Sequence, residues 1–485
     1  MSASEKAGNK NLTYYINVVV SLVLMLGIGF LPAVEPITPL GMQILGLFIG
    51  AIYAWTTVGL VWPSLLGLVL LGLTDYTTVN DAFQSGFGGS TTMFILFVLV
   101  FAYIVDKAGV TGYIARGIVS SKIGRGRPWV LSLLILTAAF VVAALVSLTP
   151  AVILVWSLLY QLCDAYGYKK FEKYPTAMIV GILIASLMGQ TAFPFKVHAI
   201  AMLGILDSQA GMTIDFVTFT VMSIIVGYAI VLVYLALLKF VFRLDVSRMK
   251  DGNFSYEGAG KLTSYQKGIL GLLVLFIALM MAPSVLPAGS AAADFFKQLG
   301  STGATVLLIA LLGIFRKASG QPLVDLVSSF KEGVAWPVIF LVSCALALAT
   351  AVVSDDAGIK AFLIQTLGPV FGGSGNAFLF LLIGTFIILA ITNCSNNLTT
   401  GLIMLPILLT FCGEVGLDPR LVTILVCTMM NFAIILPSAV PVAAMTHANE
   451  WVKSNDLYRY TIPTVIVGGI VGCILYLVMG PIFFH

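Results

Sequence analysis

Residues 374–412 read SGNAFLFLLIGTFIILAITNCSNNLTTGLIMLPILLTFC, and this stretch decides the fold. It is apolar and long enough for two helices, but a polar run at 393–397 breaks it near its middle. In lipid, every backbone N–H and C=O group needs a partner inside the protein, so a break at that depth is tolerated only where it lines a polar cavity. The stretch therefore predicts a helical hairpin that enters the membrane and returns, with a polar tip.

The composition of the whole chain also predicts a membrane location. Of its 485 residues, 59% are hydrophobic and 9% are charged, and the mean hydropathy is +1.05. A soluble domain carries about 25% charged residues, so this chain cannot cover a globule with polar side chains. We predict an all-α polytopic membrane protein with about 11 transmembrane helices of about 20 residues each, plus two re-entrant hairpins.

Apolar segments of helical length run along the rest of the chain. Unbroken helices are predicted at 13–33, 40–55, 58–74, 88–105, 216–242, 268–286, 301–316, 334–353 and 460–483. Short amphipathic pieces are predicted at 109–121 and 358–368. Three further apolar stretches contain breaks, which are 128–163 broken at 147–150, 175–206 broken at 189–194, and 420–449 broken at 437–441.

The breaks fall into two matched sets, which indicates an internal duplication. Ser147 corresponds to Ser395 at an offset of 248, and the proline-containing breaks 191–194 and 438–441 correspond at an offset of 247. The predicted organisation is an N-terminal segment and first helix at 1–38, a first repeat at 39–245 with the re-entrant hairpin 128–163, a cytoplasmic linker at 246–264, and a second repeat at 265–485 with the re-entrant hairpin 374–412.

The basic residues predict the orientation in the membrane. With a cytoplasmic N-terminus and two re-entrant hairpins, every Lys and Arg falls on the cytoplasmic side except Lys297, Lys360, Arg420 and the intramembrane Lys196. Such a bias of basic residues is the positive-inside pattern, here of a protein of the cell inner (plasma) membrane. Each repeat then contains an odd number of spanning helices, so the second repeat is inverted relative to the first.

The four breaks carry neutral polar side chains and no Asp or Glu. Helix N-termini that a break frees attract anions, whereas free carbonyl groups suit cations such as Na⁺. Ser147, Thr149 and the run 393–397 add hydroxyl and amide groups. A single Ser or Thr more often joins two helices by a hydrogen bond, but the matched tips favour a binding site for a small anion.

The architecture and these motifs resemble the divalent anion:sodium symporter (DASS, INDY-type) family of the ion transporter superfamily. That family carries a Ser-Asn-Thr motif at each of two hairpin tips and an unwound, proline-containing break in the helix that follows. The matching segments here are 146–150, 189–194, 392–397 and 436–441. The resemblance implies a homodimer in the lipid bilayer, whose transport domain moves as an elevator against a scaffold domain. It also implies transport of di- and tricarboxylates or sulfate, with Na⁺ or by exchange.

The resemblance assigns roles to residues of the second motif. Ser395 and Asn396 match positions that bind both a substrate carboxylate and one Na⁺, and Asn397 takes the place of the motif's Thr. Pro441 matches the proline after the break, and the backbone near Ala439 would supply carbonyl groups to the same Na⁺.

The first motif departs from the family pattern. Ser147 and Thr149 match, but Leu148 replaces an Asn that binds the other Na⁺ and the substrate. Lys196 stands where the family usually has an uncharged residue, and an unpaired Lys at mid-membrane costs about 2.5–3.5 kcal/mol. We hypothesise that its ammonium replaces the first Na⁺ or meets a substrate carboxylate directly. Extension toward the membrane interface is the alternative.

Other polar residues near the breaks have simpler interpretations. His198 and His447 follow the two proline breaks and could relay protons, although a packing histidine held by hydrogen bonds is commoner. Asp106 and Asp355 occupy matched helix ends, where we expect them to cap the short amphipathic pieces.

The sequence thus predicts a secondary active transporter of di- or tricarboxylate anions, and not an enzyme. Proton coupling, anion exchange and sulfate transport are alternatives within the superfamily, and an anion channel or a subunit that needs a periplasmic binding protein is an alternative outside it. An intramembrane hydrolase would use Ser147 and His198, but no acidic residue is near either in the sequence to orient the histidine. No nucleotide-binding or nucleic-acid motif occurs, and the six cysteines lack the spacing of a metal site.

Overall fold

The computed structural model describes residues 3–250, 261–287, 289–316, 320–371 and 376–484. Within these ranges the chain is helical, with no strand beyond an isolated bridge between Arg316 and Pro322. Ten described helices are long and apolar enough to cross a membrane, or eleven if the pair Leu326–Gly333 and Trp336–Val352, bent by 63°, counts as one span. The predicted all-α polytopic fold is thereby confirmed. Much of the predicted linker 246–264, at 251–260, lies outside the described residues, as do 374–375 of the second hairpin.

The helices of the first half share a compact bundle with those of the second. The first half contains α1 (Ala3–Gly27), α2 (Pro39–Thr57), α3 (Val61–Leu71), α4 (Val79–Phe87), α5 (Ser90–Lys107), α6 (Val110–Val119), α7 (Pro128–Leu145), α8 (Leu148–Ala165), α9 (Lys173–Gln190), α10 (Val197–Ala210) and α11 (Phe216–Ala236). The second half contains α12 (Ser264–Val285), α13 (Ala291–Ile314), α14 (Leu326–Gly333), α15 (Trp336–Val352), α16 (Ile359–Phe371), α17 (Ala377–Cys394), α18 (Asn397–Phe411), α19 (Pro419–Met430), α20 (Pro441–His447) and α21 (Ser454–Phe483). Short 3₁₀ or π turns are η1 (Ile28–Phe30), η2 (Lys122–Gly124), η3 (Leu237–Val241), η4 (Ser247–Met249) and η5 (Asp355–Ala357).

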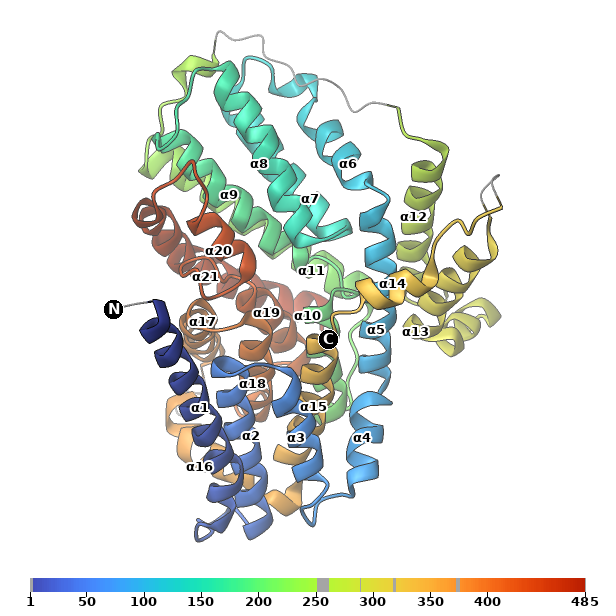
Figure 1. The fold of residues 1–485 in the computed structure, drawn as a ribbon, viewed down its shortest axis with the longest axis vertical. Coiled ribbons are helices and arrows are strands. Elements are labelled where there is room, and N and C mark those ends of the chain that lie inside the picture. The colour runs from blue at the N-terminus through green and yellow to red at the C-terminus, as the bar shows by residue number, and fades with distance from the viewer. Residues whose placement is uncertain (1–2, 251–260, 288, 317–319, 372–375, 485) are drawn as a thin grey trace.

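The order of helices repeats with the opposite direction. In each half a short helix leads into a long one, and then come a short helix, a helical hairpin, a broken helix and a long final helix. In Figure 1, α5 runs upward from α4 to α6, whereas α15 runs downward from α14. Because α5 and α15 are in contact, the two copies lie antiparallel beside each other.

Several predicted boundaries were wrong. The segment 58–74 is not one spanning helix, because α3 has 11 residues and a turn separates it from α4. The sequence prediction missed α4 and α14, since both are short and amphipathic and have little apolar content. The predicted helix 301–316 corresponds to the second part of α13, which a kink at Gly300, with φ 64°, separates from a first part that begins at Ala291 and was not predicted.

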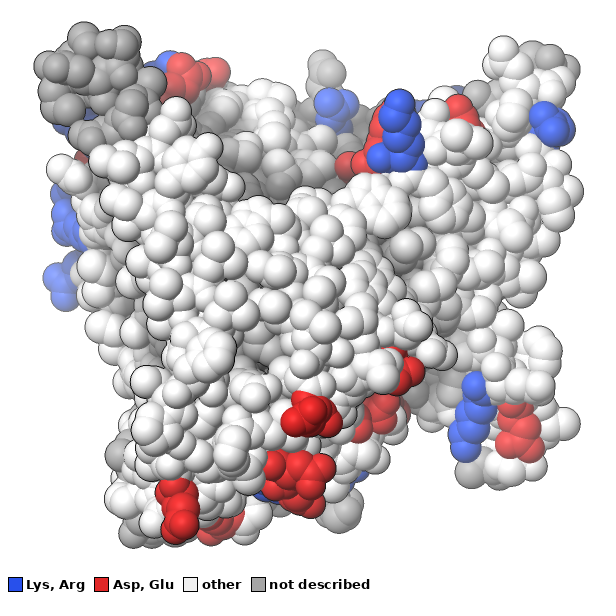
Figure 2. Space-filling view, turned by 60° about the horizontal axis from the view of Figure 1, so that its bottom comes forward, with Lys and Arg blue, Asp and Glu red and all other residues white. Residues whose placement is uncertain are grey.

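The charged side chains gather toward two ends of the molecule. Figure 2 shows a broad uncharged band between charged residues near the upper edge and mainly acidic residues toward the lower end. An apolar band between polar ends is what a membrane-spanning bundle requires, because lipid cannot solvate charge.

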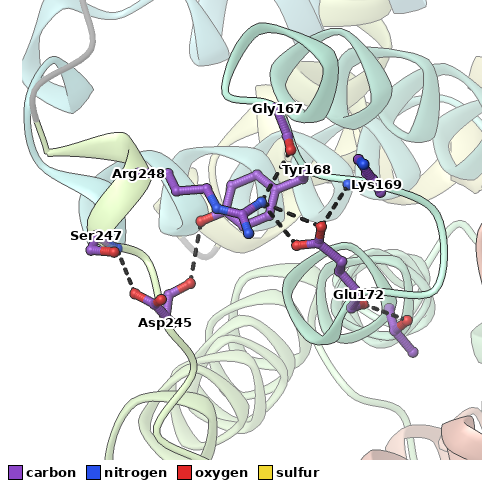
Figure 3. Close-up of polar contacts among 8 residues, drawn as sticks. Gly167, Tyr168, Lys169, Glu172, Asp245, Ser247 and Arg248 are labelled. Atoms are coloured by element: carbon purple, nitrogen blue, oxygen red, sulfur yellow. Dashed lines mark hydrogen bonds and ion pairs between the residues drawn. The ribbon is translucent and has the colours of Figure 1, made fainter.

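The chain after α11 is tied to the loop between α8 and α9 (Figure 3). Arg248 donates to the Gly167 carbonyl at 3.0 Å and forms an ion pair with Glu172 at 3.0 Å. Its guanidinium lies 4.9 Å from the ring centre of Tyr168, whose hydroxyl donates to the Asp245 carbonyl at 3.2 Å. The start of the predicted linker is therefore anchored on the end of the first hairpin.

Helix α9 forms the buried centre beside the first hairpin. Every residue from Tyr174 to Gly189 is buried, so α9 reads as a continuous apolar run. At Gly189 the backbone of α7 approaches so closely that an added Cβ would lie 2.1 Å from the Phe140 carbonyl oxygen. Glycine is required there by contact with a rigid backbone.

Replacing this glycine should destabilise the bundle. We expect Gly189→Ala to cost about 1–3 kcal/mol of stability, the range for overpacking a close-packed interior, and to lower the melting temperature in detergent. The matched control is Gly271→Ala on the exposed side of α12, where an added Cβ meets nothing within 4 Å. Equal melting temperatures for the two variants would contradict the close contact.

Candidate functional site

Both hairpin tips and both helix breaks border one cavity of about 350 Å³. Apolar residues of α5, α12 and α15 form its opposite wall. The polar and charged residues that line it are Ser147, Gln190, Lys196, His198, Asn396 and Asn397. No Asp or Glu is among the described residues that line this cavity, so its formal charge comes from a lysine.

Four helices begin at this cavity. The first residues of α8, α10, α18 and α20, which are Leu148, Val197, Asn397 and Pro441, all line it. The first N–H groups of a helix lack partners within the helix, and the macrodipole places positive partial charge there. No side chain caps α8 or α10, so their N–H groups stay available. The cavity therefore has the electrostatics of an anion site.

Lys196 brings the formal positive charge into the cavity. Its Nζ donates to the Val146 carbonyl at 2.9 Å, at the C-terminal end of α7, and lies 5.7 Å from the ring centre of Phe195. None of the ion pairs found among the described residues includes Lys196. Its charge is thus met by a carbonyl dipole and an aromatic face, and not by a carboxylate.

A hydrogen-bonded chain joins the first break to the second tip. Gln190, the last residue of α9, contacts His198 Nδ1 at 2.8 Å, and His198 Nε2 lies 3.3 Å from Asn397 Oδ1. Asn397 Nδ2 donates to Asn431 Oδ1 at 3.1 Å, and Asn431 donates to the Cys427 carbonyl at 2.8 Å. The chain links the ends of α9 and α19 across the site.

Asn393 stabilises the unwound segment at the second break through hydrogen bonds to backbone groups. Its Oδ1 accepts from the N–H groups of Ile434 and Ile435 at 2.9 and 2.7 Å, and its Nδ2 donates to the Leu389 and Phe432 carbonyls at 2.8 and 3.2 Å. These contacts replace backbone bonds that a continuous helix would make. The unwound segment consequently runs from 431 to 440 and starts earlier than the predicted 438–441.

Of the other residues proposed from the sequence, Asn396 lines this cavity and the rest do not. Ser395 is half-buried beside Thr400, with 3.3 Å between their hydroxyl oxygens, and Asn396 caps α18 through the Thr399 N–H at 3.2 Å. Thr149 is exposed. Neither Thr149, Ser395 nor the buried Ala439 is among the residues that line the cavity. His447 bonds Ser454 and the Ile435 carbonyl and does not line it either.

The predicted cap at Asp106 was wrong. The N-cap of α6 is Gly109, with φ 71° and no side-chain cap. The Asp106 carboxylate instead lies near the hydroxyl groups of Ser147 and Thr111, and neither hydroxyl makes a hydrogen bond among the described residues. An acidic residue therefore does lie near Ser147, because the fold brings α5 against the first tip. Asp355 begins the short turn η5, whose N-cap is Ser354.

Sequence reasoning also missed Gln190 and Asn431. Both end the helix that precedes a break, and both carry an amide into the polar chain. Their position directly before an interrupted apolar run was the available signal. Gln190 contacts His198 across the first break and Asn431 contacts Asn397 in the second hairpin, and only the fold shows these contacts.

Comparison with known proteins agrees with this geometry. The model of the family described as CitMHS, citrate transporter, matches residues 51–314. The chain belongs to this family. Its members are transporters, so the chain is a multi-pass membrane transporter, and the predicted likeness to DASS-type carriers is confirmed.

Two individual proteins are similar to this family member. The human protein Solute carrier family 13 member 1 is 24% identical over 230 residues, which cover 44% of this chain and 38% of the human protein. The match thus spans well under half of the human protein's length. The crystal structure of the Alcanivorax borkumensis YdaH transporter, reported to have an unusual topology, shares the fold with a TM-score of 0.62 at 13% identity, covering 97% of this chain and 99% of that one.

The role of Asn393 in holding the second break can be tested directly. We expect Asn393→Ala to lower stability by about 2–4 kcal/mol, because the buried Ile434 N–H and the partly buried Ile435 N–H lose their acceptor at about 1–3 kcal/mol each and the site relaxes partly. The measurement is thermal melting of the purified protein. Asn80→Ala on the exposed side of α4 is the control; a melting temperature for Asn393→Ala as high as that of the control would disprove the role.

Proposed function

We propose that the chain is a secondary active transporter of small di- or tricarboxylate anions, which bind in the cavity between the two hairpin tips. The observation that carries the proposal is the convergence of helix N-termini and the Lys196 ammonium at a cavity with no acidic group among its described lining residues. The match to a citrate transporter family supports it. The cavity volume of about 350 Å³ lies in the range of small-molecule sites.

Each polar group has a proposed part in binding. One substrate carboxylate is bound by Lys196 and the N-terminus of α8, next to Ser147; Thr149, which is exposed and does not line the cavity in this structure, would have to turn inward to take part. Another is bound by the side-chain amide groups of Asn396 and Asn397 at the start of α18, with Pro441 at the start of α20 beside them. Charge-assisted hydrogen bonds of this kind are about twice as strong as neutral ones.

Na⁺ is the proposed co-transported ion, at the second tip. Ser395, Asn396 and backbone carbonyl groups near Ala439 have the oxygen ligands that such an ion needs. At the first tip, Leu148 offers no oxygen and Lys196 already donates to the Val146 carbonyl. The ammonium would repel a cation, so we propose reduced sodium dependence relative to the family.

The proposed movement is an elevator within a homodimer in the inner membrane. The cavity separates the hairpins and broken helices from the apolar wall of α5, α12 and α15. The wall residues that line the cavity are apolar, so few specific bonds oppose sliding of the polar half, although the contact between Asp106 on α5 and Ser147 would have to separate. The predicted divisions 1–38, 39–245, 246–264 and 265–485, with a cytoplasmic N-terminus, belong to this proposal.

Replacing Lys196 tests the substrate site. We expect Lys196→Met to weaken carboxylate uptake into proteoliposomes about tenfold or more, since a hydrogen bond to a charged group contributes about 1.5–3 kcal/mol, and to change the dependence on Na⁺. Lys297→Met, at an exposed position on α13, is the control. Unchanged kinetics together with an unchanged sodium response would rule the role out. Counterflow of unlabelled for labelled substrate separates a carrier from a channel.

The re-entrant hairpins require two loops on opposite sides of the membrane. With Cys394 replaced by Ser, because it is the exposed member of the six free cysteines, we expect a membrane-impermeant maleimide to label Glu414→Cys on intact cells. Lys169→Cys, in the loop shown in Figure 3, should be labelled only after permeabilisation. Labelling of both from outside would contradict the proposed topology.

A further inference from the structure

We infer that Gln190 presents a fixed hydrogen-bond acceptor to the cavity, and that this oxygen selects carboxylates that also carry a hydroxyl group. The inference rests on the proposed function, because it names the substrate class that the same cavity prefers.

The backbone sets the orientation of Asn397. Its Oδ1 accepts from the Leu398 backbone N–H at 2.9 Å, and an amide NH₂ group cannot accept that bond. The same orientation lets its Nδ2 donate to Asn431 Oδ1, while Asn431 Nδ2 donates to the Cys427 carbonyl. Both ends of this segment are thus anchored on backbone groups of known polarity.

The orientation of Asn397 in turn sets the tautomer of His198. Because Asn397 Oδ1 is an acceptor, His198 Nε2 must carry the hydrogen in their 3.3 Å contact. In neutral imidazole the other nitrogen is then an acceptor. His198 Nδ1 therefore receives its 2.8 Å bond from Gln190 Nε2.

The side-chain carbonyl oxygen of Gln190 has no hydrogen-bond donor among the described residues. Oε1 is buried and makes no hydrogen bond within the described protein, and Gln190 lines the cavity. Turning the amide would place Oε1 against His198 Nδ1, so that two acceptors would face each other. The acceptor is thus held in place by the chain, and an unsatisfied buried acceptor is costly.

A hydroxyl group is the partner that fits this oxygen best. An ionised carboxylate is acceptor-only and cannot donate to Oε1. A second cation is disfavoured because Lys196 lines the same cavity and has no acidic partner in an ion pair among the described residues. A substrate hydroxyl can donate to Oε1 while its carboxylates bind Lys196 and the helix N-termini.

The test compares ligands that differ only in this hydroxyl group. Binding of (S)-malate against succinate, and of citrate against propane-1,2,3-tricarboxylate, is measured by calorimetry and thermal shift on the purified full-length protein. We expect the hydroxylated member of at least one pair to bind about tenfold more tightly, because a site built to bond a hydroxyl rejects the analogue that lacks it. No preference in either pair overturns the inference, and this comparison needs no variant.

A variant then assigns the preference to Gln190. Gln190→Met keeps the side-chain length and removes the oxygen together with the donor to His198, so we expect the ratio within each pair to fall to about one to two, whatever change in affinity the two members share. Gln161→Met, exposed on α8, should keep the wild-type ratio. A retained ratio in Gln190→Met, or a change in sodium dependence alone, overturns the inference and marks Oε1 as something other than a hydroxyl acceptor. If none of the four compounds binds, the proposed function itself fails.

Discussion

Unpaired backbone groups at helix ends inside a membrane are the constraint on which this structure depends. Each of the four breaks leaves N–H or C=O groups without helical partners, and lipid offers none. In this fold the first residues of four helices, α8, α10, α18 and α20, all lie at one cavity. The same backbone groups that would destabilise an isolated broken helix become the positive lining of an anion site.

In the two repeats, different side chains bind the unpaired backbone groups at the breaks. At the second break, Asn393 binds backbone groups on both sides and takes the place of the missing helical bonds. At the first, Lys196 supplies a charge and a donor to the Val146 carbonyl. The chain from Gln190 through His198 to Asn397 then joins the halves, so the cavity is one site built from both repeats.

Much of the architecture could be predicted because helix length and hydropathy are local properties. The hairpin turns lie within one or two residues of the predicted breaks, because polar residues and proline grouped in an apolar stretch mark an interruption of the helix. The misplaced elements have local explanations too. Helices α4 and α14 are short and amphipathic, and the start of the second unwound segment at 431 depends on Asn393, which is distant in sequence.

The sequence by itself determined a polytopic helical protein, its duplicated breaks and the polar groups at each of them, because composition and periodicity suffice for these. Only the tertiary structure decided which groups meet. In the folded protein Gln190 and Asn431 belong to one chain of hydrogen bonds. Asp106 lies near Ser147 and does not cap α6, and Thr149 does not line the cavity. Contacts such as that between His198 and Asn397, which are 199 positions apart, depend on how helices pack, and packing is a property of the whole bundle rather than of any segment.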